Sequence, residues 1–130
     1  MKILKYIFTC FSILTLATFM ELDLYEDVSS AIRSGNSKQI ASYFGSTVDL
    51  TILSQEEVYS KTQAELVLRD FFSKNPPKSF SILHKGSSKE GTLYAIGNMT
   101  TTNGAVFRTS FFLRKADDKY LIQELRFETE

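Results

Sequence analysis

Residues 59–77 have the sequence Tyr59-Ser60-Lys61-Thr62-Gln63-Ala64-Glu65-Leu66-Val67-Leu68-Arg69-Asp70-Phe71-Phe72-Ser73-Lys74-Asn75-Pro76-Pro77, which predicts the longest helix of the chain. Ser60 and Gln63 form a capping box, in which the Gln63 backbone N–H donates a hydrogen bond to the Ser60 hydroxyl. Pro76 disfavours the helical conformation at the residue before it and so ends the helix. The apolar residues recur at three- and four-residue steps and form one stripe of Ala64, Val67, Leu68, Phe71 and Phe72. A stripe with two phenylalanines needs a sheet to lie on.

Two shorter helices and one strand are predicted before this helix. The helices run from Asp23 to Gly35 and from Asn36 to Gly45, because each begins with a capping box and ends at a glycine. Residues 48–53 alternate in polarity and are rich in β-branched side chains, so they predict a strand.

An antiparallel sheet is predicted after Pro77, where the apolar period changes from that of a helix to that of a strand. Its four strands are expected at residues 79–85, 92–102, 105–115 and 120–128. Asn103-Gly104 predicts a two-residue type I′ turn, which pairs Thr102 with Ala105 and fixes the register. This register places eight residues on the inner face, toward the long helix, namely Tyr94, Ile96, Asn98, Thr100, Phe107, Thr109, Phe111 and Leu113.

The register of the last strand depends on the loop at Asp117-Asp118. A two-residue loop would bury Ile122, Glu124 and Arg126. A loop that is longer by one residue turns the strand over and buries instead Leu121, Gln123, Leu125 and Phe127. Two buried charges are costly, so the longer loop is expected.

The strand at residues 79–85 is oriented by the same reasoning. Phe80 and Ile82 are its apolar residues, so they are expected to point inward. His84 follows two residues later and would then lie on the inner face near Tyr94.

Several segments resemble a known family. They are Val58-Tyr59-Ser60-Lys61, residues 70–80, His84-Lys85-Gly86-Ser87-Ser88, Tyr94-Ala95-Ile96-Gly97 and residues 120–126. Their sequences resemble those of a family of small exported bacterial proteins called domain of unknown function 4783. The order of elements over residues 25–128 is similar to that of the nuclear-transport-factor-2-like superfamily. The resemblance implies an α+β, nuclear-transport-factor-2-like (cystatin-like) roll. In that fold a curved antiparallel sheet wraps one long helix, two short helices precede it, and a conical pocket remains. It implies export and no catalytic residues.

The first twenty residues have the layout of a secretory signal peptide. Lys2 and Lys5 precede an almost wholly apolar segment at residues 7–19, and the first acidic residue is Glu21. We therefore expect a signal peptide at residues 1–20 and one exported domain at 21–130, in the periplasm, the cell envelope or the medium. Cys10 lies within the signal peptide, and the residues before it do not fit a lipoprotein signal, so lipidation is not expected. We expect the protein to meet the membrane only during export.

The exported domain would carry no strong net charge. Removing Lys2 and Lys5 leaves 13 of the 15 Lys plus Arg residues against 15 Asp plus Glu residues. Such a balance gives no electrostatic footprint for nucleic acid. With Cys10 removed, no thiol remains for disulfide or redox chemistry.

Two of our three functional hypotheses concern the inner face. A small apolar molecule or a peptide could bind in a pocket lined by Tyr94, Asn98, Thr100, Thr109, Phe111, Gln123 and Phe71, because polar groups among aromatic ones are typical of ligand sites. An isomerase- or dehydratase-like enzyme could use His84 as a base with Tyr94. No acidic residue accompanies them on the assigned inner-face positions, so the non-enzymatic hypothesis is favoured.

The third hypothesis is a structural or interaction module that forms a homodimer through the outer face of the sheet. The expected interface combines apolar side chains with arginines, namely Met99, Val106, Arg108, Phe112, Arg114, Tyr120 and Ile122. No cofactor is expected. No metal is expected either, because the chain has one histidine and no acidic cluster at ligand spacing along the sequence.

Overall fold

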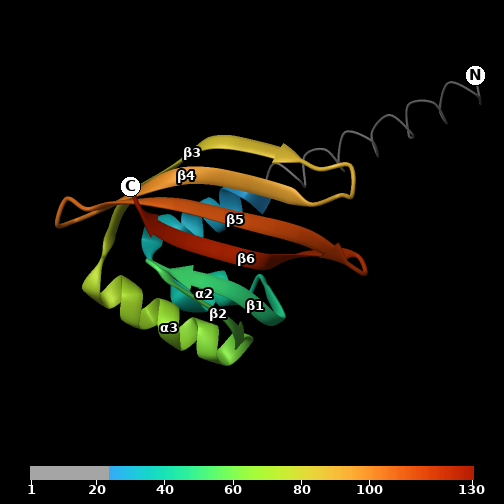
Figure 1. Ribbon diagram of the computed structural model, residues 1–130, viewed down its shortest axis with the longest axis horizontal. Helices are drawn as coiled ribbons and strands as arrows, with labels where there is room; N and C mark the ends of the chain where they lie inside the picture. The colour runs from blue at the N-terminus through green and yellow to red at the C-terminus, as the bar shows by residue number, and fades with distance from the viewer. Residues whose placement is uncertain (1–23) are drawn as a thin grey trace, which may run out of the picture.

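Residues 24–130 form an α+β roll, in which one curved sheet lies against three helices (Figure 1). The computed structural model describes these residues, so the predicted signal peptide, Cys10 and the Asp23 cap lie outside the described part. A first helix spans residues 24–34. It is followed by α2 (Ser37–Ala41), β1 (Phe44–Ile52), β2 (Gln55–Ser60), α3 (Lys61–Lys74), β3 (Pro77–Ser87), β4 (Leu93–Thr101), β5 (Val106–Ala116) and β6 (Lys119–Thr129). Among the described residues, no helix is long and apolar enough to cross a membrane.

Helix α3 confirms the prediction made for residues 59–77. Ser60 is the N-cap, and its hydroxyl accepts a hydrogen bond from the Gln63 backbone N–H at 3.3 Å. The helix ends at Lys74, and Asn75 is its C-cap. Its predicted stripe faces the sheet, with Val67 partly buried and four residues buried, namely Ala64, Leu68, Phe71 and Phe72.

The two N-terminal helices meet at Gly35, which has the left-handed φ of +64° expected of a C-terminal glycine. The Asn36 side chain then caps α2 by accepting a hydrogen bond from the Gln39 backbone N–H at 3.0 Å. Helix α2 ends at Ala41, so the prediction that it continues to Gly45 was wrong. Phe44 is the first residue of β1, and its side chain, which is 2% exposed, packs into the core from this strand.

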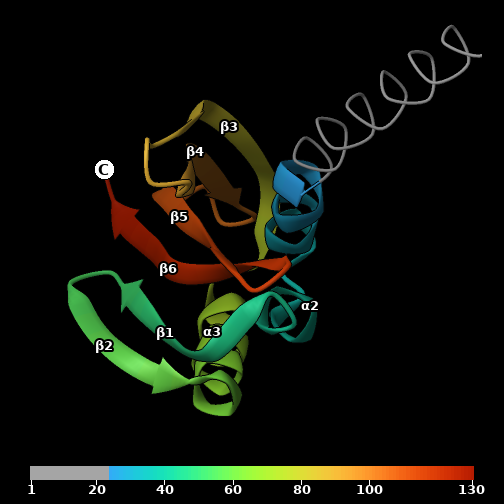
Figure 2. The same cartoon turned by 90° about the vertical axis from the view of Figure 1, so that its right-hand side faces the viewer.

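The sheet has the strand order β2-β1-β6-β5-β4-β3. β1 pairs with β6 in parallel, and the other neighbours are antiparallel. β2 was not predicted, because its residues are mostly polar and exposed and show no apolar alternation. It returns from β1 through the turn Leu53-Ser54 and leads directly into α3 (Figure 2).

The β4–β5 hairpin has a three-residue loop rather than the predicted two-residue turn. The Thr101 backbone N–H donates to the Ala105 carbonyl at 2.9 Å, and Gly104 has a φ of +89°. This is the arrangement of a type I turn followed by a left-handed residue. Met99 therefore pairs with Phe107, one position away from the predicted register.

The shift turns β4 over while leaving the faces of β5 as predicted. Leu93, Ala95 and Met99 face the core. The four β4 residues predicted to point inward, Tyr94, Ile96, Asn98 and Thr100, lie on the outer face instead.

Strand β6 combines a short turn with a bulge. Ala116 pairs with Lys119 around the two-residue turn Asp117-Asp118, so the prediction of a longer loop was wrong. The register then shifts between Phe112 and Leu113, which leaves Gln123 as an extra residue and exposes it. The bulge turns the strand over midway, so it buries all of its core residues, namely Ile122, Leu125 and Phe127.

Strand β3 also contains a register shift, between Ile82 and His84. Phe80 is buried as predicted. His84 is exposed and pairs with Ile96 on the outer face, so its predicted position on the inner face was wrong. The extra residue at Leu83 is the cause, because it changes the face of every residue after it.

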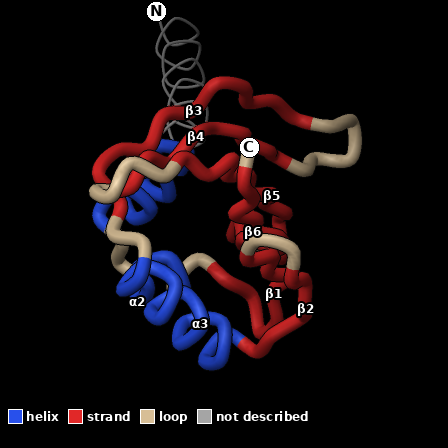
Figure 3. Tube along the Cα trace, turned by 60° about the vertical axis from the view of Figure 1, so that its left-hand side comes forward, coloured by secondary structure: helices blue, strands red, loops and turns tan. Residues whose placement is uncertain are grey.

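The core lies on the concave side of the sheet, between the sheet and the helices (Figure 3). Phe71 of α3 contacts Phe107 and Phe127, with ring centroids 5.4 and 5.0 Å apart. Phe72 contacts Phe127 edge to face at 5.7 Å. These aromatic contacts join the long helix to β5 and β6, and the opposite face of the sheet carries no helix (Figure 3).

Candidate functional site

The residues predicted to line one pocket are divided between the two faces of the sheet. Phe71, Thr109 and Phe111 are at most 4% exposed and are packed in the core. The Thr109 hydroxyl donates a hydrogen bond to the Phe107 carbonyl at 3.2 Å. The others lie elsewhere: Tyr94, Asn98 and Thr100 are on the outer face, and Gln123 is exposed. These residues therefore do not surround one cavity, because the predicted register of β4 was wrong by one residue.

The predicted catalytic pair also lies on the outer face. His84 is exposed and pairs with Ile96, and Tyr94 lies two positions before Ile96 on β4. The Tyr94 ring lies over Gly86 and near Phe112, with ring centroids 6.3 Å apart. Within residues 24–130 no hydrogen bond joins His84 to Tyr94, and neither residue faces the core.

The predicted interface residues are divided between the outer face and the core. Val106, Arg108, Phe112 and Arg114 follow one another along the outer face of β5. Met99 and Ile122 are 0% exposed and belong to the core, so their assignment to the interface was wrong. Tyr120 is half-buried and packs against the core.

The outer face is ordered in rows that cross the whole sheet. The first row contains Gly86, Tyr94, Phe112, Glu124, Asp49 and Val58. The second contains His84, Ile96, Ser110, Arg126, Thr51 and Glu56. Both rows change character between β5 and β6. The half over β4 and β5 is largely apolar, and the half over β6, β1 and β2 is largely charged.

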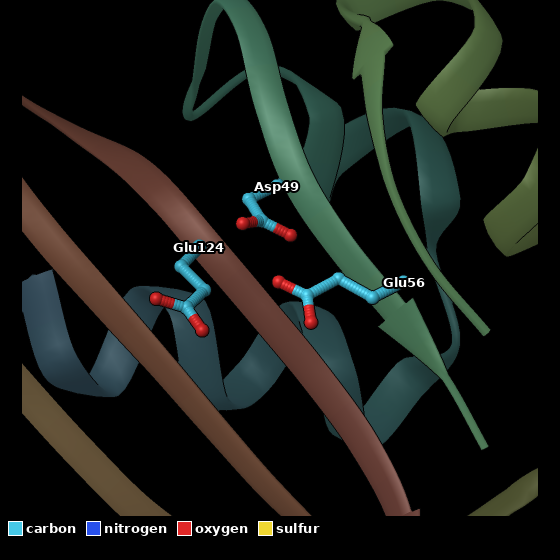
Figure 4. A group of neighbouring side chains, drawn as sticks. All are labelled: Asp49, Glu56 and Glu124. Atoms are coloured by element: carbon cyan, nitrogen blue, oxygen red, sulfur yellow. The ribbon is translucent and has the colours of Figure 1, made fainter. Parts of the chain in front are cut away.

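Three carboxylates meet in the charged half. Asp49, Glu56 and Glu124 come from β1, β2 and β6, and we call them the acidic cluster. Each offers an oxygen within 4.8 Å of the others, and Figure 4 shows the three side chains converging over the strands. Asp49 and Glu124 are half-buried, whereas Glu56 is exposed.

Arg126 is the cation beside the acidic cluster. Its Nη1 lies 3.5 Å from Glu124, and its Nη2 lies 4.0 Å from Glu56. Its Nε lies 2.9 Å from a carboxylate oxygen of Glu128. The two groups form an ion pair, but the Nε–H does not donate a hydrogen bond. One guanidinium therefore pairs with three carboxylates, and Asp49 forms no ion pair within the described residues.

The surplus of negative charge acts on Glu124. Burial raises the pKa of Glu124 above its usual value, Arg126 opposes this, and the neighbouring carboxylates of Asp49, Glu56 and Glu128 raise the pKa further. The net direction is upward, so the attraction of Arg126 does not compensate for the surroundings.

Two oxygens beside the acidic cluster lack hydrogen-bond partners. Asp49 Oδ1 and Thr51 Oγ1 are both buried and unpartnered. Thr51 is 4% exposed and pairs with Glu56 on one side and with Arg126 on the other. Asp49 and Thr51 are two residues apart on β1, so their side chains share the outer face.

The sequence analysis missed the acidic cluster because its members are far apart along the chain. β2 was not predicted, and the parallel pairing of β1 with β6 has no local signal in the sequence. The available signal was Asp49 within a β-branched strand, since a charge at such a position must find partners on a neighbouring strand.

Comparison with known proteins gives consistent results. A family model described as "Domain of unknown function (DUF4783)" matches residues 25–128. A DUF4783 family protein from Bacteroides fragilis YCH46 is 35% identical over 80% of this chain and 96% of that chain, with a TM-score of 0.74. Another, from Bacteroides uniformis ATCC 8492, is 33% identical over 81% of this chain and 95% of that chain, with a TM-score of 0.75. An NTF2-like designed protein, "Rd1NTF2_04 with long sheet", is 12% identical over 81% of this chain and 96% of that chain. Its TM-score of 0.66 shows a shared fold. No curated protein matches the chain.

Proposed function

We propose that this chain, which belongs to the DUF4783 family and has a nuclear-transport-factor-2-like fold, is a non-enzymatic interaction domain that pairs with a second copy through the outer face of its sheet. The observation that carries the proposal is an apolar patch on a face that no helix covers (Figure 3). The patch consists of Tyr94, Ile96 and Phe112, which are half-buried neighbours on β4 and β5, and Val106 lies farther along β5 beyond Arg108. Apolar side chains gathered on an uncovered sheet face are typical of a partner surface.

The aromatic part of the patch is held in place by its neighbours. A Cβ atom at Gly86 would come within 2.8 Å of the Tyr94 hydroxyl, so the tyrosine ring occupies the space that a side chain at Gly86 would need. Phe112 lies beside it, with its ring inclined by 33° to that of Tyr94. A surface that is already ordered loses less side-chain entropy when a partner binds.

A second copy suits this surface because the patch is self-complementary in its chemistry. Two sheets can pack face to face when their facing residues are apolar, and a two-fold axis presents the same patch to itself. Arg108 and Arg114 border the patch on β5, and neither forms an ion pair within residues 24–130. Charged residues at the rim of an apolar centre are the usual arrangement of an interface.

We also propose that the domain is exported, on the basis of its N-terminal sequence. Lys2, Lys5 and the apolar segment at residues 7–19 support export of the domain. The small-ligand hypothesis lacks comparable support, because its predicted pocket residues lie on both faces of the sheet.

Sedimentation of the exported domain over a range of concentrations tests the proposal. We expect a monomer–dimer equilibrium that Phe112→Glu shifts toward the monomer, since a charge would be placed in the apolar contact. The control is Leu66→Glu, which changes an exposed leucine on α3, on the other side of the molecule. A wild-type protein that stays monomeric up to about 0.1 mM, well above a typical Kd for a specific interface, would contradict the proposal.

A further inference from the structure

We infer that the acidic cluster, together with Thr51, binds a divalent cation of the size of calcium. The site draws on β1, β2 and β6 and uses no residue of the apolar patch. The inference therefore goes beyond the proposed pairing of two copies and can hold or fail independently of it.

The first argument is that two buried oxygens on the same face of β1 have no partner. Asp49 Oδ1 and Thr51 Oγ1 are shielded from solvent and accept or donate no hydrogen bond. A buried polar atom without a partner costs free energy, and in folded proteins it usually has a role such as binding an ion. The register places Thr51 between Glu56 and Arg126, so Thr51 lies beside the acidic cluster on the same face of the sheet.

The second argument is that Arg126 satisfies the carboxylates poorly. Its contacts with Glu124 and Glu56, at 3.5 and 4.0 Å, are longer than charge-assisted hydrogen bonds of about 2.7–2.9 Å. The short contact, at 2.9 Å, is with Glu128, which is not part of the acidic cluster. Arg126 therefore leaves Asp49, Glu56 and Glu124 without a short charge-assisted hydrogen bond.

The third argument is the chemistry and spacing of the donors. Carboxylate and hydroxyl oxygens are hard ligands, which suit calcium or magnesium rather than zinc or copper. The three carboxylate oxygens lie within 4.8 Å of one another. Calcium accepts an irregular shell of oxygens, whereas magnesium demands near-ideal octahedral geometry, so three carboxylates from separate strands favour calcium.

The expected affinity is modest. Three carboxylates on separate strands and one neutral hydroxyl make a less complete shell than a dedicated calcium loop, and extracellular modules bind calcium with Kd values of roughly 10⁻⁴–10⁻³ M. Such a site would be filled only where calcium is abundant.

Thermal unfolding in the presence and absence of calcium tests the inference. We expect about 10 mM CaCl₂ to raise Tm by several degrees over NaCl of equal ionic strength, and MgCl₂ to raise it less. The measurement is made on the full domain and repeated in a Phe112→Gln background, which disrupts the apolar contact without adding a carboxylate beside Glu124. A calcium response that persists there separates this site from the pairing of two copies.

Matched variants locate the ion. Asp49→Asn and Glu124→Gln should each remove most of the calcium response. Glu57→Gln should retain it, because Glu57 is exposed on the same strand as Glu56 but points to the other side. Thr51→Val should raise Tm without calcium, since it removes a buried unpartnered hydroxyl, and should reduce the response to calcium.

Broadening of NMR signals by Mn²⁺ gives an independent location of the site. The amides of residues 49–51 and 124–126 should broaden at low Mn²⁺ concentrations, and those of β3 should not. The inference is overturned if calcium acts no better than NaCl or MgCl₂, if Asp49→Asn responds as the wild type does, or if the broadening is spread over the surface.

Discussion

Asp49 lies directly opposite Glu124 across the parallel pair of β1 and β6, so two carboxyl groups are neighbours on the outer face of the sheet. Like charges directly opposite each other destabilise a sheet unless other groups compensate for them. Arg126 pairs with Glu124 but not with Asp49. The outer face therefore combines an acidic half with an apolar half, and the predictions below concern these surfaces and the core that supports them.

Replacing Glu124 should change how stability depends on pH. Its pKa is raised by burial and by the neighbouring carboxylates, so the folded protein holds this proton at a higher pH than the unfolded chain does. Unfolding then releases protons between the two pKa values, and stability falls as the pH rises through that window. We expect Glu124→Gln to gain stability relative to the wild type as the pH rises from 4 toward 7, in denaturant titrations. Glu57→Gln serves as the control, and a difference that does not vary with pH would contradict this explanation.

Tryptophan substitutions on the two faces should separate core from surface. Thr109 is 0% exposed, so Thr109→Trp forces a large ring into a packed core and should destabilise the domain by about 3 kcal/mol or more. Asn98→Trp adds the same ring on the outer face, where the residue is half-buried, and should leave the domain folded. Circular dichroism and thermal melts distinguish the two. A stable Thr109→Trp variant would revive the ligand-pocket hypothesis, because only an open cavity could accept the ring.

A side chain at Gly97 should be poorly tolerated. A Cβ atom there would lie 2.1 Å from the Ser81 carbonyl oxygen, and backbone atoms cannot move aside as a flexible side chain can. We expect Gly97→Ala to lower the free energy of unfolding by about 2–3 kcal/mol. Gly45→Ala is the matched control, since its nearest contacts would be ordinary ones at 3.6 Å. Equal effects of the two substitutions would show that β3 can move away from β4.

The turn between β1 and β2 should be improved by asparagine at Leu53. Leu53 has a φ of +60° and its side chain is 45% exposed. The left-handed conformation costs roughly 1–2 kcal/mol for most residues and less for asparagine. Leu53→Asn should therefore stabilise the domain by about 0.5–1 kcal/mol in chemical denaturation. Leu53→Ala removes the same apolar side chain without relieving the backbone, so an asparagine variant no more stable than the alanine variant would disprove the explanation.

The elements with strong local signals could be predicted from the sequence. Ser60, Gln63 and Pro76 fixed the ends of α3, since caps and proline act within a few residues. The alternation along β5 was also sufficient, because Phe107, Thr109 and Phe111 face the core under either hairpin register. The order of the elements predicted from these patterns was what resembled the known superfamily, and it lacked only β2.

The candidate sites could not be predicted, because they depend on pairings between strands. Gly104 adopts a left-handed conformation in a two-residue or a three-residue turn, so Asn103-Gly104 does not decide between the registers. The choice determined whether Tyr94 or Met99 pointed inward. The extra residue Gln123 likewise changes which face the later residues of β6 occupy. This bulge lets β6 bury Ile122 as well as Leu125 and Phe127, which neither loop length could do alone. One-residue differences of this kind decide which side chains meet, although they barely alter the fold.

The central position of β6 has a consequence for how the chain folds. β6 lies between β1 and β5, and it is the last of the six strands of this sheet in chain order. The β1–β2 hairpin is made early but can join the rest of the sheet only after residues 119–129 have left the ribosome. Pairings between segments so distant in the chain slow folding, and they leave strand edges exposed to aggregation while the chain waits. Refolding of this domain should therefore be limited by the docking of β1 onto β6, long after α3 and the β4–β5 hairpin have formed.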